Sequence, residues 1–317
     1  MTQFDRDAAS GARARQDMLT KPAGSLGRLE DLAVFMAGWQ RTDRPRIAHA
    51  QAIVFAGNHG VVAQRVNPFP AAVTAQMVRN FRSGGAAINQ LARIAGADLG
   101  VVALDLDRPT ADFTAGPAMT AAEVDAAMDA GRAAVDDRAD VLILGEMGIG
   151  NSTVAAALAG AVCGGRAEDW VGPGTGAEGE ILANKLRAVA QGLHRHAPRT
   201  AHQTLQAFGG REQAAICGAI LRARSLRIPV ILDGFICCAA AAVLTRDDPD
   251  ALAHALIGHE SAEPGHRRLV AALGLAPILS LDMRLGEGSG AAVALMVLRA
   301  ALACHDGMAT FAEAGIG

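Results

Sequence analysis

The chain has 317 residues, of which 51% are hydrophobic, 19% charged and only 3% aromatic, and its formal net charge is −3. A chain of this length buries roughly 75% of its unfolded surface, so its core needs neither disulfides nor a structural metal ion. The small negative charge and the shortage of aromatic rings argue against nucleic acid as a partner, because they provide neither an attractive field nor a stacking platform.

The first 45 residues predict two helices joined by a turn at residues 21–27, and they contain no strand-like run. We expect this segment to form a small helical domain together with the C-terminal helices, from about residue 291 to 317. Residues 46–290 then form a large α/β domain that binds the substrate. No low-complexity linker marks the boundary between the two parts.

Between these ends, short apolar runs alternate with helical patterns. The runs lack the alternation of half-exposed strands, so they predict strands that are buried on both faces. This order predicts an α/β fold with an open, mostly parallel sheet flanked by helices. The predicted strands are residues 52–56, 101–104, 141–144, 230–232 and 278–281. The predicted helices include residues 121–136, 152–162, 181–196, 211–224 and 291–304.

The cysteines and the start of the chain predict a cytoplasmic protein. An odd number of cysteines, no CxxC pair and apolar surroundings indicate buried, reduced thiols at Cys163, Cys217, Cys237, Cys238 and Cys304. The first residues carry Asp5 and lack the apolar region of a signal peptide. The most membrane-like stretch, residues 228–245, is interrupted by Pro229, Asp233 and Gly234. A spanning helix needs about 20 apolar residues, so we expect no membrane association.

Glycine-rich turns follow most of the predicted strands. Ligands of open α/β sheets bind outside the carboxyl ends of the strands, and glycines that lead into a helix let backbone N–H groups converge on an anion. None of the turns matches GxGxxG or GxxxxGK[ST], so they favour a sugar phosphate or mononucleotide over a dinucleotide. The alternative is that each glycine only shapes a tight turn. The turns are residues 57–60, 145–153, 233–234 and 282–290, with a separate glycine cluster at 172–176.

Two glutamates occupy similar positions in these turns. Glu146 and Glu287 each lie between glycines, directly after a predicted strand and before a predicted helix. Burial in a cleft raises the pKa of a carboxyl group toward the range of a general base. A carboxylate that caps a helix N-terminus has a lowered pKa instead, and the sequence leaves this alternative open.

Other catalytic arrangements are disfavoured. The chain has no GxSxG motif, and the group His259, Glu260, Glu263 and His266 lacks the HExxH spacing, so we expect it to be solvated or to lie in a ligand loop without binding zinc. His59 follows the first strand and either faces the cleft or is a satisfied loop histidine. Because clustered carboxylates for Mg²⁺ are missing from the phosphate turns, we expect no metal requirement.

Several stretches occur in a characteristic order between residues 21 and 291. They are 21–30 (KPAGSLGRLE), 59–61 (HGV), 73–78 (VTAQMV), 84–89 (GGAAIN), 145–153 (GEMGIGNST), 184–185 (NK), 232–235 (LDGF) and 284–291 (RLGEGSGA). In this order they resemble the nicotinate-nucleotide:dimethylbenzimidazole phosphoribosyltransferase family of cobalamin lower-ligand synthesis. The resemblance covers most of the chain, and the two glutamate stretches are specific.

The resemblance implies a homodimer with a parallel-sheet domain and a small helical domain, acting without a cofactor. It also implies a reaction in which a nitrogen of dimethylbenzimidazole displaces nicotinate from nicotinate mononucleotide, with inversion at the anomeric carbon. The pyridinium leaves as a neutral ring and needs no acid, whereas the attacking azole gains positive charge and must lose its ring proton to a base.

The resemblance assigns the base to Glu287 and a supporting role to Glu146, with the glycine turns and Lys185 holding the phosphate. Asn58 stands where many relatives have Asp, and residues 172–176 cannot be matched one by one, so the contacts to the aromatic base stay open. The implied substrate-binding residues are Asn58, His59, Gln76, Gly148, Gly150, Asn151, Ser152, Gly174, Gly176, Lys185, Asp233, Gly234, Gly288, Ser289 and Gly290.

Two other classes of function compete with this one. A nicotinamide-dependent oxidoreductase needs the dinucleotide motif that is missing here. A non-catalytic nucleotide- or α-ribazole-binding protein keeps the phosphate turns but has no need of Glu287, which is present.

Overall fold

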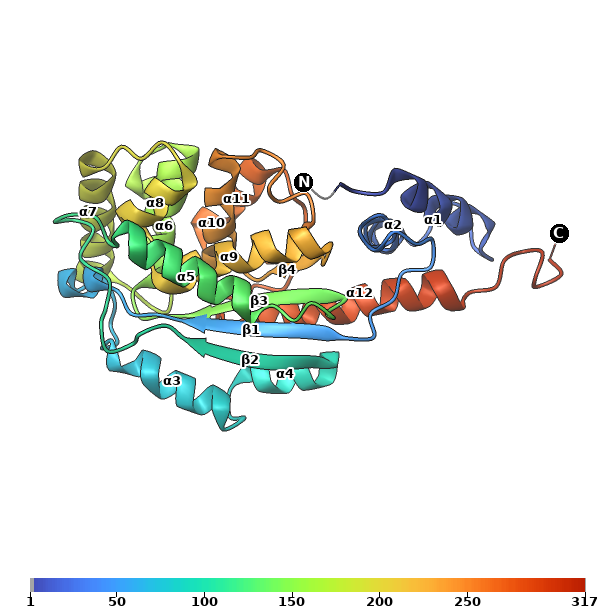
Figure 1. Cartoon of the computed structure of the whole chain (residues 1–317), viewed down its shortest axis with the longest axis horizontal. Coiled ribbons are helices and arrows are strands. Elements are labelled where there is room, and N and C mark those ends of the chain that lie inside the picture. The colour runs from blue at the N-terminus through green and yellow to red at the C-terminus, as the bar shows by residue number, and fades with distance from the viewer. Residues whose placement is uncertain (1–2, 317) are drawn as a thin grey trace.

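A six-stranded parallel sheet with the order β2-β1-β3-β4-β5-β6 organises the computed structural model, which describes residues 3–316 (Figure 1). The predicted α/β class is therefore confirmed. The chain places β2 on one side of β1 and β3 on the other, so the strand order reverses between β1 and β3, where ligands of such sheets bind. The strands are β1 (Ala50–Ala56), β2 (Ala97–Ala103), β3 (Val141–Met147), β4 (Val230–Leu232), β5 (Ala255–Glu260) and β6 (Pro277–Ser280).

The strands bury both faces, which explains their uninterrupted apolar sequences. In β3, Leu142 and Leu144 belong to one core cluster, whereas Val141 and Ile143 belong to the other. The first face is covered by α5 (Ala121–Ala134), α6 (Asn151–Cys163), α7 (Gly179–Arg195), α8 (Ala201–Phe208), α9 (Arg211–Leu226), α10 (Phe235–Val243) and α11 (Pro264–Leu273). The second is covered by α3 (Ala72–Arg82), α4 (Ala87–Ala95) and α12 (Ser289–Gly307).

The sequence analysis missed β5. Only its first three residues, 255–257, are uniformly apolar, and Gly258, His259 and Glu260 break the run. Of the two positions expected for His259, solvated or in a ligand loop, the solvated one is wrong, because this residue lies within β5 and is only 1% exposed. A second difference concerns β3, which extends to Met147 and therefore includes Glu146.

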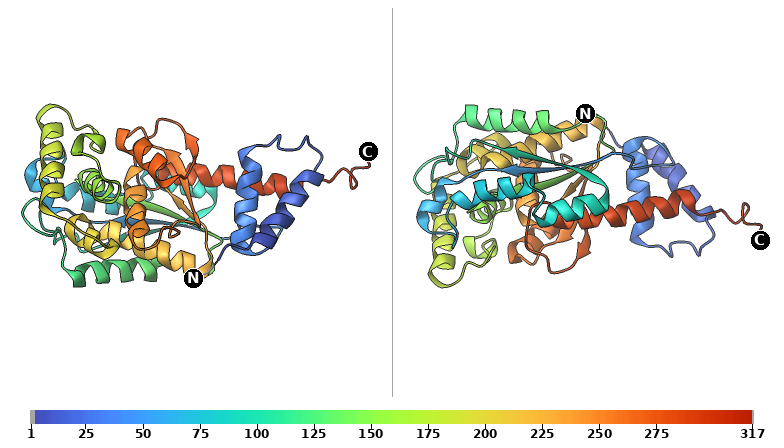
Figure 2. Two further views of the ribbon diagram at one scale, coloured as in Figure 1. Left: turned by 90° about the horizontal axis from the view of Figure 1, so that it is seen from above. Right: turned by 90° about the horizontal axis from the view of Figure 1, so that it is seen from below.

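At the far end of the sheet, α1 (Arg6–Met18) and α2 (Arg28–Gln40) pack against each other, and α2 packs on α12 (Figure 2). The helix–turn–helix predicted for the first 45 residues is present. A two-domain division at residues 46 and 291 stays a prediction, since α12 begins against the sheet and runs out to the two N-terminal helices. Met1, Thr2 and Gly317, at the edges of the predicted helical domain, lie outside the described residues.

Within residues 3–316, α12 is the one helix long and apolar enough to cross a membrane. Half of that stretch is buried inside the protein, and Ala291, Leu295 and Leu298 belong to the core on the second face of the sheet. Packing on the sheet therefore accounts for the apolar character of α12.

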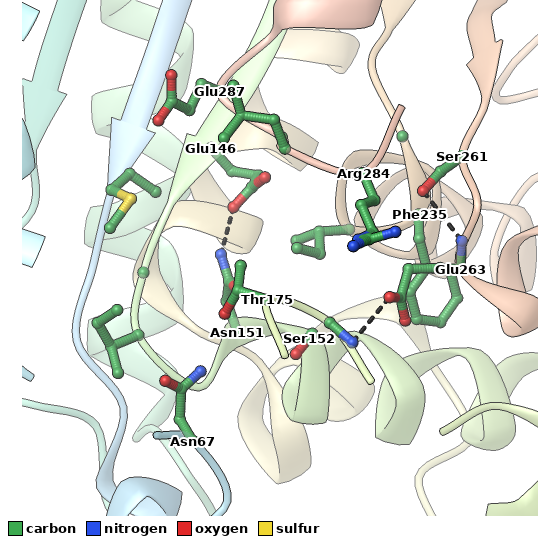
Figure 3. Close-up of a pocket in the computed structure, with 18 of the residues that line it drawn as sticks. Asn67, Glu146, Asn151, Ser152, Thr175, Phe235, Ser261, Glu263, Arg284 and Glu287 are labelled. Carbon is green, nitrogen blue, oxygen red and sulfur yellow. Dashed lines mark hydrogen bonds between the residues drawn. The ribbon is translucent and has the colours of Figure 1, made fainter. Parts of the chain in front are cut away.

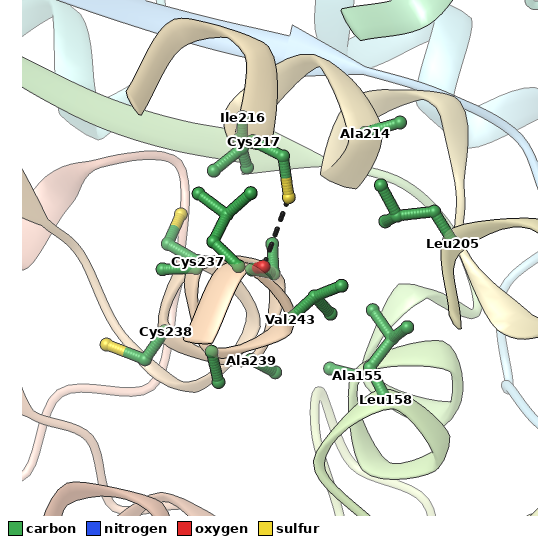
Figure 4. Packing of buried hydrophobic residues seen from close by; sticks show 14 of the residues in the cluster. Ala155, Leu158, Leu205, Ala214, Ile216, Cys217, Cys237, Cys238, Ala239 and Val243 are labelled. Atoms are coloured by element: carbon green, nitrogen blue, oxygen red, sulfur yellow. Dashed lines mark hydrogen bonds between the residues drawn. The ribbon is translucent and has the colours of Figure 1, made fainter. Parts of the chain in front are cut away.

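All five cysteines are free. Cys217 on α9 and Cys237 and Cys238 on α10 are buried, and the Cys217 thiol donates to the Ala240 carbonyl oxygen at 3.1 Å (Figure 4). Burial raises the pKa of the Cys217 thiol to about 12, which keeps it protonated. The prediction of a buried thiol is wrong for Cys163, which is exposed because it ends α6 at the surface.

Candidate active site

A cavity opens at the carboxyl ends of the strands (Figure 3). Its wall is built by the turns that follow β3, β4, β5 and β6, so residues far apart in sequence meet there. The strand ends, these turns and the first residues of the helices that follow contribute Glu146, Met147, Gly148, Ile149, Asn151, Ser152, Gly234, Phe235, Ile236, His259, Ser261, Glu263, Arg284, Leu285, Gly286 and Glu287. Asn67, Gly174 and Thr175 complete the lining.

Glu146 lies near the end of β3 and is only 4% exposed. The Asn151 amide donates a hydrogen bond to its carboxyl group. Burial raises the pKa of Glu146 to about 8, and the nearby charges of Asp233, Glu212 and Glu287 add to this shift. At neutral pH, Glu146 therefore holds a proton.

Glu287 faces the same cavity from the turn before α12, so the structure brings the two glutamates together. Burial and the charge of Asp233 raise its pKa to about 7, and its Oε2 atom is buried without a hydrogen-bond partner. The helix-capping alternative fails for both glutamates, because the N-cap residues of α6 and α12 are Gly150 and Gly288 and neither has a side-chain cap. A carboxyl group with these properties suits a general base near neutral pH.

The opposite side of the cavity carries positive charge. Lys185 on α7 is 1% exposed and donates to the Gly172 carbonyl oxygen at 2.7 Å and to Ser152 Oγ at 3.1 Å. Burial lowers the pKa of Lys185 to about 8, against the opposing effect of Glu263. Arg284 projects into the same region (Figure 3). The cavity therefore has a carboxylic end and a cationic end.

The loop at residues 172–176 is tied to this cationic end. The Gly174 N–H donates to Glu263 Oε1 at 2.8 Å, and Gly174 adopts a left-handed φ of 57°. A Cβ atom there would lie 2.9 Å from Ser152 Oγ, so the close approach to Ser152 favours glycine. Burial raises the pKa of Glu263, whose Oε2 atom has no hydrogen-bond partner.

A second buried pair lies behind the cavity wall. His59 and Glu212 are almost fully buried, and 3.1 Å separates His59 Nε2 from Glu212 Oε1. A Cβ atom on Gly148 would lie 2.8 Å from His59 Nε2, so His59 packs behind this cavity-lining glycine. His59 is buried and does not line the cavity, but neither of its ring nitrogens has a hydrogen-bond partner, so neither interpretation of this residue is confirmed. Asn58 does not line the cavity either, and its amide donates to the Leu106 carbonyl oxygen at 2.9 Å.

The other candidate residues divide into two groups. Seven of them line the cavity: Glu146, Glu287, Gly148, Asn151, Ser152, Gly174 and Gly234. Lys185 lies directly behind Ser152, and Gly150, Gly176, Asp233, Gly288, Ser289 and Gly290 belong to the turns around the cavity without lining it. Gln76 is an exposed residue on α3, outside the lining.

Sequence reasoning missed several lining residues. Ser261 and Glu263 follow β5, which was overlooked, so Ser261 was not singled out and Glu263 was named only within a group expected to be solvated or to lie in a ligand loop. Arg284 lies in a stretch that carried the family resemblance, which was a usable signal. Phe235 lies in another such stretch, 232–235, and Thr175 in the glycine cluster at 172–176. Asn67 carried no signal, because a loop residue of this kind reaches a cavity only through tertiary folding. Among residues 3–316, no three His, Cys, Asp or Glu side chains are arranged to hold a metal ion.

This fold and this cavity define a class: an α/β enzyme whose cavity, at the carboxyl ends of a parallel sheet, has the buried Glu146 and Glu287 at one end and Lys185 and Arg284 near the other. A family model described as phosphoribosyltransferase matches residues 1–316. The chain belongs to the nicotinate-nucleotide–dimethylbenzimidazole phosphoribosyltransferase family, which confirms the resemblance found in the sequence.

Proteins of that name support the assignment over nearly the whole chain. The one from Rhodobacter capsulatus is 60% identical, and the one from Ruegeria pomeroyi is 61% identical, each match covering 98% of this chain and 93% of the relative. A crystal structure of the enzyme from Thermus thermophilus superimposes with a TM-score of 0.93 at 40% identity, covering 99% of both chains.

Proposed function

We propose that this protein transfers the 5-phosphoribosyl group of nicotinate mononucleotide to dimethylbenzimidazole, giving α-ribazole 5′-phosphate and nicotinate. The observation that carries this proposal is the pairing of Glu146 and Glu287 in one cavity, with the pKa of Glu287 raised to about 7 by burial and by Asp233. A base with this pKa is half deprotonated at neutral pH and strong enough to accept a proton from an azole that is becoming cationic.

The bond changes balance without a further reactant. A ring nitrogen of dimethylbenzimidazole attacks the anomeric carbon, and the bond from that carbon to the pyridinium nitrogen breaks. The bonding electrons return to the pyridine ring, which leaves as nicotinate. The proton on the other nitrogen of the azole passes to Glu287. Attack from the face opposite the leaving group inverts the configuration.

The protonated state of Glu146 fits this scheme. With a pKa near 8, its carboxyl group can donate a hydrogen bond, and it adds no second negative charge beside Glu287. The phosphate of the nucleotide binds at the cationic end, near Lys185, Ser152 and the backbone of residues 172–176. This division places the reacting bond between the two ends of the cavity.

We expect the protein to act as a cytoplasmic homodimer without cofactor or metal. Light scattering coupled to size-exclusion chromatography measures the oligomeric state. A monomer at assay concentration contradicts the dimer.

The experiment that tests the function is a direct assay. The protein is incubated with nicotinate mononucleotide and dimethylbenzimidazole, and nicotinate and α-ribazole 5′-phosphate are separated by chromatography. Equal amounts of the two products, unchanged by excess chelator, are expected. Binding of the nucleotide without release of nicotinate would favour the alternative, a non-catalytic binding protein.

A further inference from the structure

Asp233, which follows β4, is fully buried and does not line the cavity. Both of its carboxylate oxygens are already engaged by backbone groups of the turn that carries Glu287. Oδ2 accepts a hydrogen bond from the Gly288 N–H at 3.1 Å, and Oδ1 accepts one from the Ala291 N–H at 2.9 Å. A carboxylate that is fully buried, outside the cavity lining and bonded to the backbone through both oxygens is not placed to contact a substrate.

The segment that Asp233 holds has an unusual backbone. Gly286, Glu287 and Gly288 have consecutive φ angles of 86°, 66° and 86°, all in the left-handed region. For a glutamate this conformation is unfavourable, and it persists only where surrounding contacts enforce it. The N-cap of α12 is Gly288, which has no side chain, so Asp233 supplies the missing cap from a different element.

Other elements press on the same turn. A Cβ atom on Gly145 in β3 would lie 2.5 Å from the backbone carbon of Glu287, so the strand and the turn are in close contact. From β5, His259 packs against Gly290, where an added Cβ atom would lie 2.0 Å from His259 Cδ2. His259 Nε2 lies 3.6 Å from Asp233 Oδ1, and neither ring nitrogen of this histidine has a hydrogen-bond partner.

We infer that Asp233 is a positioning residue for Glu287 and not a ligand of the substrate. It fixes the left-handed turn from which Glu287 reaches the cavity, while Gly145 and His259 confine the same turn from β3 and β5. The inference rests on the proposed function for its kinetic consequences. The two backbone hydrogen bonds can be tested without it.

The charged and titratable groups around Asp233 come from each neighbouring element. They are Glu146 from β3, His259 from β5, Glu287 from the turn and the thiols of Cys237 and Cys238 from α10. Burial raises the pKa of Asp233, against the opposing effects of His259 and the backbone N–H donors. The charge of Asp233 in turn raises the pKa of Glu287.

The test is Asp233→Asn. The amide keeps the shape of the side chain, but its NH₂ group faces a backbone N–H where a carboxylate oxygen stood, so the turn must shift. A misplacement of about 1 Å costs on the order of 10²-fold in rate, so we expect kcat to fall by about 10²-fold. The KM for nicotinate mononucleotide should change less than about 3-fold, because the phosphate is held elsewhere.

Thr200→Ala is the matched control for loss of a helix cap. Thr200 is exposed, caps α8 through a 3.1 Å bond from the Gln203 N–H and lies outside the cavity. It should lower the melting temperature to a similar degree and leave kcat unchanged. If Asp233→Asn does not fold, Asp233→Ser, which keeps a smaller acceptor, undergoes the same measurements.

The pH dependence of kcat/KM shows whether Asp233 acts on Glu287 or has only a structural role. Removing the charge of Asp233 lowers the pKa of Glu287, so the acid limb of kcat/KM should move to lower pH in Asp233→Asn. An unchanged limb together with an unchanged kcat overturns the inference. A raised KM with kcat preserved overturns it as well, because that result makes Asp233 a substrate ligand.

Amide hydrogen exchange provides the measurement that does not depend on turnover. The Gly288 and Ala291 amides should be protected in the wild-type protein and exchange faster in Asp233→Asn, with no change at the Gln203 amide. If the wild type shows no turnover, the proposed function fails. This measurement still shows whether Asp233 holds the Gly288 and Ala291 amides. Equal protection of both amides in wild type and variant rejects it.

Discussion

Charged side chains are buried at both ends of this molecule, but their surroundings shift their pKa values in opposite directions. At the helical end, Lys21 and Glu30 form a 2.7 Å ion pair, and Glu30 also accepts the Leu26 N–H at 3.1 Å. At the cavity, the charged groups that act on Glu146 and Glu287 are other acids, which add to the effect of burial. Burial acts to raise the pKa of Glu30, but the bonds from Lys21 and Leu26 outweigh it and the net shift is downward.

The difference shows how to separate a structural charge from a functional one. A buried charge with every bond satisfied stabilises the fold and stays in one protonation state, whereas a buried acid beside like charges costs stability and can take up or release a proton near neutral pH. Both kinds of residue belong to the stretches that carried the family resemblance. The resemblance assigned a role to Glu287 and none to Glu30, and the surroundings of the two carboxylates give the physical reason for the difference.

The largest expected effect is that of Glu287→Gln on turnover. Glutamine keeps the shape of the side chain but cannot accept the azole proton, and a general base contributes about 10²–10⁴-fold in rate. We expect a loss of this size in nicotinate release, with nucleotide binding nearly unchanged. Calorimetric titration with nicotinate mononucleotide provides the control. Undiminished turnover would show that Glu287, like Glu30, has a structural role only, and would contradict the distinction drawn between the two.

Gly145→Ala should have the next largest effect. An added Cβ atom would lie 2.5 Å from the backbone of Glu287, so the turn must move. We expect turnover to fall by about 10²-fold from misplacement of the base and stability to fall by about 1–3 kcal/mol from overpacking. The matched control is Gly100→Ala on β2, where the added atom would meet its nearest neighbour, the Ala52 carbonyl oxygen, at an ordinary 3.8 Å. Equal behaviour of the two variants would show that β3 does not confine the turn.

Glu30→Gln tests the other end of the molecule. It leaves the buried Lys21 ammonium without its counter-charge, and loss of one partner of a buried polar pair costs about 1–3 kcal/mol. We expect a lower midpoint in urea denaturation with kcat per folded molecule unchanged. A large fall in kcat at full folding would show that the helical end takes part in the reaction.

Much of the molecule could be predicted from the sequence, for physical reasons that also explain the failures. Buried parallel strands are apolar throughout, so runs such as residues 141–144 were recognisable, whereas β5 ends in His259 and Glu260 and was not. The resemblance correctly indicated Glu146 and Glu287 as neighbours in one cavity. The hydrogen bonds of Asp233 to the turn of Glu287 could not be predicted from the sequence, because its partners are backbone groups 55 and 58 positions away in the chain.

The smallest expected effect is a pH-dependent gain of stability in Glu287→Gln. Burial and Asp233 raise the pKa of Glu287 from 4.5 to about 7 in the folded protein. Between these values the unfolded chain releases the proton before the folded protein does, so rising pH favours unfolding. The contribution of Glu287 to stability is complete below pH 4.5 and is lost as pH rises through about 7. Glutamine does not titrate and avoids this loss.

We therefore expect Glu287→Gln to melt like the wild type near pH 5 and a few degrees higher near pH 8. Glu30→Gln is the control of opposite sign. The pKa of Glu30 is lowered, so its stabilising contribution is present above its usual pKa of 4.5 and is lost as pH falls. Its variant should be destabilised near pH 8 and approach the wild type in acid. Scanning calorimetry across this pH range measures both curves. The different surroundings of the two carboxylates predict melting curves that converge at low pH and diverge in opposite directions above neutrality. Two parallel curves would mean that the carboxylates share one kind of environment.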